Sequence, residues 1–389
     1  MQKANKSFLE SVNPRHLIII KNIIYFICGI ILLLFSLPFI LLLTLEKYEY
    51  LDDSFAITGT IGDTLNGIFN PLIGTFAVIT TFLAFIVQYR ANQLYREDVD
   101  SQRFETRFYE LLKMHKDNVN EMEINNKYFK RNTFVKMFEE LRFLYFVIEN
   151  AKEQFKIEKN YPIFNITKEG IIELAYFFFF FGVNEKLRIE DFSKIKVHSP
   201  FYLYCREKIY FHQDYFIRSF SEKEKEPITM YLDSKNSYSF SIYLKTDFYP
   251  FDGHASRLGH YYRHLYQMIK FVVLSKELRN FDQKYEYIKI IRAQLSNYEQ
   301  AIIYYNSFFY AGKVWWEDTS IDLKKDDGKH VSYLLDYALI KNLPFNLIDF
   351  GVPPEEKFTQ KLKQNGLNQA EVEVKLKWLF EWMEINNNL

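Results

Sequence analysis

Three side chains suited to acid–base or phosphate chemistry recur on one side of a helical pattern around residues 259–278. Arg257, His260 and His264 stand at positions i, i+3 and i+7, a spacing that keeps side chains on one helix face. Histidine exchanges a proton near neutral pH, and arginine stabilises negative charge on phosphoryl oxygens. This face therefore predicts either chemistry on an anionic substrate or a polar contact with another helix.

A second polar stripe follows in residues 285–309, which we expect to form one continuous helix. Its members recur at i, i+4, i+7 and i+14, and they are Arg292, Ser296, Glu299 and Asn306. A neighbouring strip of the first helix holds Arg263, Tyr266 and Lys270. Antiparallel packing of the two helices would bring both stripes into one seam.

The simplest interpretation of this seam is structural. A buried or half-buried polar seam fixes helix register, and Glu299 would then pair with an arginine. A metal site is the second interpretation, because His260 and His264 have the i, i+4 spacing of two zinc ligands. No carboxylate of an HExxH pattern lies between them and no third ligand is evident, so the sequence predicts no metal and no other cofactor.

RNA cleavage is the third interpretation. Six residues separate Arg257 from His264, which resembles the Arg-x(4–6)-His motif of HEPN-type ribonucleases. The resemblance implies that His264 acts as acid or base and that Arg257 stabilises a phosphoryl transition state, with His260 as a further catalytic candidate. So short a motif also arises by chance.

Two apolar stretches near the N-terminus determine where these helices reside. Residues 23–45 and 68–89 contain no Asp, Glu, Lys or Arg, and about 20 apolar residues span a bilayer core of ~30 Å. They predict a transmembrane hairpin over residues 23–89. Basic residues flank it on both outer sides, namely Lys3, Lys6, Arg15, Lys21, Arg90 and Arg96, whereas residues 46–67 carry a net charge of −4. Both termini are therefore expected in the cytoplasm, with residues 46–67 as an external loop and the second span beginning at Asn70-Pro71.

The remaining chain predicts a mostly α-helical protein. After a cytoplasmic basic tail (1–22) and the hairpin, we expect a stalk helix over 90–122, a cytoplasmic helical domain over 123–345 and C-terminal helices over 346–389. An apolar stripe begins at Phe104 and includes His115, which we expect to be a satisfied core or boundary histidine. The five phenylalanines at 177–181 are expected in the core. Residues 184–256 predict loops and short helices, with a small β-hairpin near 238–245.

Composition narrows the function classes. Lys and Arg together number 49, as do Asp and Glu, which argues against a general nucleic-acid binder because such proteins carry a basic excess. The two cysteines, Cys28 and Cys205, lie far apart in the sequence and suggest no disulfide framework. With 13 glycines and 10 prolines in 389 residues, helix breakers are few.

Five segments in order resemble the putative phage abortive-infection protein family, a bacterial, membrane-anchored family. They are residues 58–89, 104–119, 259–272 (GHYYRHLYQMIKFV), 290–306 (IIRAQLSNYEQAIIYYN) and 339–344. The resemblance implies an inner-membrane protein of antiviral defence, in which infection leads to arrest or death of the host cell. The positions closest to its motifs are His260, Arg263, Tyr266, Arg292, Gln294, Glu299 and Asn306.

The leading hypothesis is therefore a membrane-anchored antiphage defence protein with a cytoplasmic sensing or effector domain. The expected partners are the lipid bilayer and either a phage-derived trigger or a neighbouring defence protein. One alternative is a tethered HEPN-like ribonuclease, whose partner would be RNA. Another is an oligomeric membrane-disrupting pore made of several copies of the chain, although Ser36, Thr75, Thr80 and Thr81 are its only polar lining candidates.

The two apolar stretches generate the first prediction. The chain should stay in the membrane pellet after a carbonate wash and ultracentrifugation, and detergent should release it, because about 20 buried apolar residues per span hold it in lipid. Immunoblotting of pellet and supernatant measures this. A chain that appears in the carbonate supernatant without detergent would contradict the membrane assignment.

Overall fold

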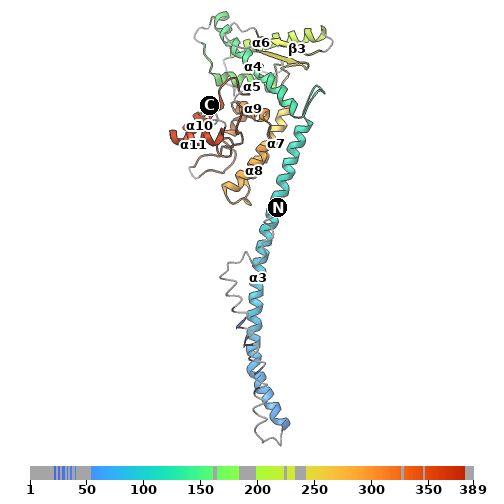
Figure 1. The fold of residues 1–389 in the computed structure, drawn as a ribbon, viewed down its shortest axis with the longest axis vertical. Coiled ribbons are helices and arrows are strands. Elements are labelled where there is room, and N and C mark those ends of the chain that lie inside the picture. Colours follow the sequence, from blue (N-terminus) through green and yellow to red (C-terminus); the bar gives the residue numbers. More distant parts are fainter. Residues whose placement is uncertain are drawn as a thin grey trace. The chain divides into compact units, whose positions relative to one another are not determined.

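The computed structural model divides the chain into two compact units, Met1–Glu97 and Asp98–Leu389. It describes residues 54–160, 164–183, 199–222, 226–232, 242–325, 328–344 and 347–381, with isolated positions between 22 and 40. Helix α3 (Ser54–Glu121) begins in the first unit and ends in the second (Figure 1).

Within the described residues, one helix is long and apolar enough to cross a membrane, Phe69–Glu121. Its most apolar 18-residue window has a mean hydropathy of 1.9, and none of that window is buried in the protein. Most of the first expected span, 23–45, lies outside the described residues. The positions described there include Tyr25, Phe26 and Leu33, which are helical and exposed. The two-helix hairpin therefore stays a prediction.

Helix α3 corrects the expected start of the second span. It begins at Ser54, so Asn70-Pro71 does not open it, and Pro71 lies inside the helix. Gly59, Gly62 and Gly67, which belong to the expected external loop, also lie within it. Glycine and proline break helices in water, but they are more frequent in helices that span membranes. In this chain they do not mark the start of the helix.

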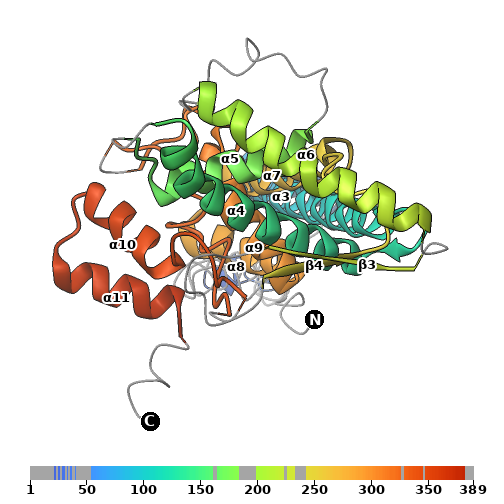
Figure 2. The ribbon, with the colours of Figure 1, turned by 90° about the horizontal axis from the view of Figure 1, so that it is seen from above.

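The second unit is mostly helical, with two small antiparallel hairpins (Figure 2). The hairpins are β1–β2 (Glu123–Ile124, Tyr128–Phe129) and β3–β4 (Ile228–Tyr231, Tyr243–Thr246). The helices after α3 are α4 (Arg131–Glu158), α5 (Lys168–Phe181), α6 (Ser199–Glu222), α7 (Ala255–Leu274), α8 (Phe281–Ala293), α9 (Asn297–Asn306), the 3-10 helix η2 (Tyr310–Trp315), α10 (Pro354–Gln364) and α11 (Gln369–Leu379).

Helix α4 lies at the centre of the core, where it packs against α5, α6 and α9. Its buried side chains include Phe134, Met137, Phe138, Leu141, Leu144 and Val147. Of the five phenylalanines in α5, Phe177 to Phe179 are fully buried, which confirms the core interpretation. The stripe on α3 is likewise buried at Phe104 and Phe108.

Two expected elements differ in the structure. The single helix over 285–309 is wrong, because α8 ends at Ala293 and α9 starts at Asn297. Residues 199–222, expected as loops and short helices, form the long helix α6. The small hairpin expected near 238–245 is present as β3–β4.

The start of α7 is fixed by a close backbone contact with the end of α5. Gly182 and Gly253 both have positive φ, +82° and +92°. A Cβ at Gly253 would lie 2.6 Å from the carbonyl carbon of Phe181, and one at Gly182 would lie 2.5 Å from the Asp252 carbonyl oxygen. Only glycine combines this φ with this approach. The loop before α7 is therefore held directly against α5.

Glu140 of α4 holds the same loop from the other side. This carboxyl is 1% exposed, and its Oε1 accepts a hydrogen bond from the Phe251 amide at 3.1 Å. The same oxygen lies 3.4 Å from Nε2 of His254, the residue before α7. Phe251 has a φ of +62°, a strained conformation for a bulky residue that the carboxylate contact helps to maintain.

The glycine contact generates the second prediction. Gly253→Ala should destabilise the folded chain by more than about 2 kcal/mol, because a Cβ there is strained by φ and meets backbone atoms. Gly259→Ala is the matched control in α7, since a Cβ there has nothing within 4 Å, and it should be neutral or stabilise by up to about 1 kcal/mol. Melting temperatures of the detergent-solubilised chain measure both. Equal melting temperatures for the two variants would refute the contact.

Candidate functional site

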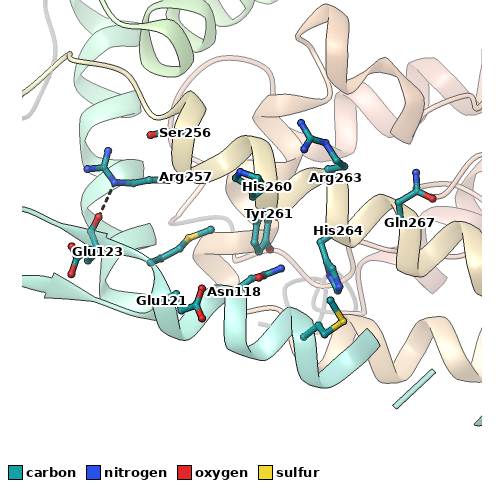
Figure 3. Close-up of a pocket in the computed structure, with 12 residues that line it drawn as sticks. Asn118, Glu121, Glu123, Ser256, Arg257, His260, Tyr261, Arg263, His264 and Gln267 are labelled. Carbon is teal, nitrogen blue, oxygen red and sulfur yellow. Dashed lines mark hydrogen bonds between the residues drawn. The ribbon is translucent and has the colours of Figure 1, made fainter. Parts of the chain in front are cut away.

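The second unit contains a cleft of about 800 Å³ between the C-terminal end of α3 and one face of α7. Asn118 and Glu121 line it from α3, and Glu123 of β1 closes one end (Figure 3). The α7 wall is polar and basic, and it consists of Ser256, Arg257, His260, Arg263, His264 and Gln267, with Tyr261 beneath.

The three residues proposed for catalysis from the sequence all line this cleft. His260 is exposed, whereas Arg257 and His264 are partly buried. The Arg257 Nε donates to the Glu123 carbonyl oxygen at 2.7 Å, so the β1 backbone fixes this guanidinium, while His264 points toward α3 (Figure 3). Two helical turns separate the Cα atoms of Arg257 and His264, about 10 Å along the axis. They can contact different groups of one extended ligand.

One histidine of the cleft contacts a second, buried histidine that does not line it. The His264 ring stacks on His115 of α3, with centroids 6.0 Å apart and planes at 20°. His115 is 1% exposed, and its ring centroid lies 5.3 Å from that of Tyr261. Within the described residues, neither ring nitrogen of either histidine has a hydrogen-bond partner. The prediction that His115 is buried is confirmed, but the prediction that it is satisfied is wrong.

Burial keeps both imidazoles neutral near pH 7. The pKa of His115 is lowered to about 4, mainly by burial and to a smaller extent by the neighbouring His264 and Arg131. Burial also lowers the pKa of His264. A neutral imidazole has one acceptor nitrogen and one donor N–H, and in both rings these groups are buried without a partner among the described residues.

Glu299 does not reach the cleft but lies under it. Its Oε2 accepts hydrogen bonds from the Ser296 amide at 2.8 Å and from the Ser296 hydroxyl at 2.7 Å. The Glu299 amide donates in return to the Ser296 Oγ at 3.3 Å, and the two bonds that involve backbone amides form the capping box of α9. Its Oε1 accepts from the Tyr261 hydroxyl at 3.2 Å. The nearest cation is Arg131 of α4, with Nε at 3.7 Å. The structural interpretation of the seam predicted that Glu299 pairs with an arginine. Its arginine partner is Arg131, which lies on α4 and not on either helix of the predicted seam.

The other seam residues hold the fold together. Arg292 Nη1 donates to the Ala338 carbonyl at 2.6 Å. The Tyr266 hydroxyl donates to Asp318 Oδ2 at 2.9 Å. Asn306 Oδ1 accepts from the Trp315 indole at 2.8 Å. Arg292, Tyr266, Asn306 and Glu299 therefore have the structural role that the first interpretation predicts. Arg263 does not, because it is exposed at the cleft.

Sequence reasoning missed the α3 side of the cleft. Asn118 follows His115 by three residues and lies one turn away on the same part of α3. That spacing was visible, but nothing in it indicates that α7 would pack alongside. Gln267 was also missed, although it continues the i, i+3 progression from His264.

The comparisons with known proteins agree with the resemblance seen in the sequence. Residues 253–319 match the family model described as putative phage abortive infection protein. The match runs from the loop before α7 to the turn after η2, so it includes the α7 wall of the cleft. It covers the segments 259–272 and 290–306, while those at 58–89, 104–119 and 339–344 lie outside it. Comparisons with curated proteins and with solved structures gave no match.

The buried His115 generates the third prediction. Its pKa is about 4 in the folded chain and about 6.5 when unfolded, so the unfolded state binds more protons between these values. The contribution of His115 to the free energy of unfolding is fully present above pH 6.5. It falls by up to about 3 kcal/mol as the pH drops toward 4. His115→Phe should lose this dependence while keeping a ring against Tyr261.

Melting temperatures of the solubilised full chain at pH 7 and pH 4.5 test the difference. The exposed His260→Gln serves as control and should keep the wild-type dependence. Burial raises the pKa of Glu299, and this shift makes stability fall as the pH rises, opposite to the effect of His115. The wild type and both variants contain Glu299, so its contribution cancels in the comparison. A His115→Phe variant with the same pH dependence as wild type would refute the assignment.

Proposed function

We propose that the protein is a membrane-anchored bacterial antiphage defence protein that acts by abortive infection. The observation that carries the proposal is the family match over residues 253–319. These residues build the α7 wall of a polar cleft, which includes His264, a histidine whose ring nitrogens have no partner among the described residues. The cleft is then the site that senses infection or carries out the toxic step.

The exposed apolar surface of α3 supports the anchor. Its window of mean hydropathy 1.9 is not buried by any part of the described chain, and so large an apolar surface is stable in lipid rather than in water. The charge pattern of the flanks supports a multi-pass arrangement in the inner membrane, with both termini in the cytoplasm. The second unit then faces the cytoplasm, where a phage-derived trigger or a neighbouring defence protein can reach it.

A tethered ribonuclease is the second candidate function, and one observation favours it. Arg257, His260 and His264 line the same cleft. His264 is neutral at pH 7 because burial lowers its pKa, which suits a general base. Arg257 is held in place by the Glu123 carbonyl and suits binding of a phosphate.

The pore alternative draws less support from the described hydroxyls. Thr75 donates to the Pro71 carbonyl at 2.8 Å, and Thr81 donates to the Ala77 carbonyl at 2.7 Å. Thr80 and Ser36 likewise donate to their own helix backbone. Hydroxyls bonded in this way offer little to a water-filled lining.

Phage plating tests the proposed function and gives the fourth prediction. Cells that express the chain should plate at least one phage of a broad panel less efficiently than cells with an empty vector. Arg263→Ala should lose at least about tenfold of that protection, because an exposed guanidinium at a cleft contributes binding rather than folding energy. Arg218→Ala on α6 is the matched control, since Arg218 is an exposed arginine outside the cleft.

Unchanged plating across the panel would contradict the proposed function. Equal protection by the two arginine variants would instead show that the cleft has no part in the defence function. Membrane levels of each variant, measured by immunoblot, separate a lost site from a lost protein.

RNA integrity during infection separates the two candidate functions and gives the fifth prediction. If the cleft is a ribonuclease site, host or phage RNA should fragment in infected cells with the wild-type chain. His264→Ala should leave the RNA intact at normal membrane levels, because the general base is gone. His330→Ala, a histidine outside the cleft, is the control. Intact RNA with the wild-type chain throughout a protective response would exclude the ribonuclease.

A further inference from the structure

His264 lines the cleft, but its ring nitrogens are turned away from any ligand there. Both nitrogens are buried, and neither has a hydrogen-bond partner within the described residues. His260, one helical turn earlier, is exposed instead. A general base has to come within hydrogen-bond distance of the proton that it removes. In the conformation of this structure, His264 is therefore unable to act on a substrate.

The residue that His264 contacts across the cleft wall is His115 of α3. The two rings stack, with centroids 6.0 Å apart, and His264 points toward α3 (Figure 3). His115 also lies against Tyr261, with ring centroids 5.3 Å apart. The Tyr261 hydroxyl is itself fixed by a hydrogen bond to Glu299 at 3.2 Å. His115 thus joins the cleft histidine to a part of the core that is firmly held.

This histidine contact has a cost that the rest of the core does not share. All four ring nitrogens of His115 and His264 are buried without a partner among the described residues. Buried polar groups are normally hydrogen-bonded, and each unpaired group costs free energy because it has lost its water. Separation of the two rings would let water reach these nitrogens. The loss of the stack is therefore offset by hydration, which makes the contact easy to break.

Helix α3 stays attached to the second unit on both sides of the histidine contact. Phe108 is fully buried, and its ring centroid lies 4.8 Å from that of Tyr287 on α8. Beyond the end of α3, the Glu123 carbonyl accepts a hydrogen bond from Arg257 at 2.7 Å. The two histidine rings can therefore separate without detaching α3 from the second unit.

We propose that the stack of His115 on His264 keeps the cleft inactive, and that breaking this contact activates it. The inference rests on the proposed function, with His264 as the reacting group, and it adds how that site is regulated. In uninfected cells the ring nitrogens of His264 are withheld from substrate. A phage-derived trigger then has only to favour the state in which the two rings are apart.

Modification of histidines by diethyl pyrocarbonate measures the shielding of His264 in the purified full chain, in an uncharged detergent at pH 7. In the wild type, His264 should react at least about tenfold more slowly than exposed His260, because the reagent reaches it only when the contact opens. His115→Ala removes the stack, so His264 should react as fast as His260. His115→Phe keeps a ring and removes two unpaired nitrogens, so it should slow the reaction of His264 by about a further tenfold.

Growth of uninfected cells measures whether the contact controls the toxic step. His115→Ala should lower colony formation by at least about tenfold relative to the wild type, because the closed state is lost. His115→Ala combined with His264→Ala should restore growth, which a toxic misfolded chain would not do. Lys116→Ala is the matched control, since Lys116 is the exposed neighbour on α3 and lies outside the cleft.

His115→Phe provides a second variant that acts in the opposite direction. It should leave uninfected cells healthy and protect them against phage less well than the wild type, because the closed contact is favoured. A merely structural role of His115 would not make the Ala and Phe variants differ in sign.

Three outcomes would overturn the proposal. One is a wild-type chain in which His264 reacts as fast as His260. Another is the same rate for His264 in the wild type and in His115→Ala. The third is normal growth of uninfected cells that contain folded His115→Ala in the membrane. The modification rates involve no phage, so a chain that shields His264 but protects against no phage in the panel would contradict the proposed function and not the shielding.

Discussion

One buried carboxylate joins the helices on which the cleft depends. Glu299 has no exposed surface, yet it accepts hydrogen bonds from the Ser296 amide and hydroxyl at the start of α9 and from Tyr261 of α7. Arg131, the first residue of α4, provides the nearby positive charge. Burying a carboxylate is costly unless its oxygens are satisfied. These partners keep α4, α7 and α9 in a single arrangement.

The arrangement of α7 follows from this contact and from the glycine contact at its start. Tyr261 fixes the helix from beneath, and Gly253 holds the preceding loop against α5. Its apolar residues, such as Leu258 and Leu265, are then buried in the core. The opposite strip carries His260 and Arg263, which are exposed at the cleft (Figure 3). The cleft side chains are therefore available for a ligand, because other residues stabilise the helix that carries them.

Helical periodicity predicted elements that bury one face, such as the stripe on α3 that begins at Phe104. It failed where apolar spacing continues across a break, as between α8 and α9. The local signature of that break was present, because Ser296-Asn-Tyr-Glu299 is the S-x-x-E pattern of a capping box. Here a cap at the start of a helix outweighs the periodicity that runs through it.

The start of α3 differs from the prediction because glycine and proline usually indicate turns. Pro71 lies near the start of the apolar stretch 68–89, and proline is more frequent in apolar helices of that length than in helices in water. Gly59, Gly62 and Gly67 precede that stretch, in a segment that contains Asp63. The apolar pattern therefore does not explain why the helix extends back to Ser54.

The candidate site was predictable only on one side. The spacing of Arg257, His260 and His264 placed them together on α7, and the family resemblance pointed to His260 and to Arg263 on the same helix. Their partner His115 belongs to a helix far away in the sequence, and its residue type indicated only a buried histidine. What marks it as unusual is a pair of ring nitrogens with no partner. Whether a polar group has a hydrogen-bond partner depends on its surroundings and not on its residue type. Spacing along the sequence therefore identifies groups that share a helix face, but it does not identify groups that the fold leaves without a partner.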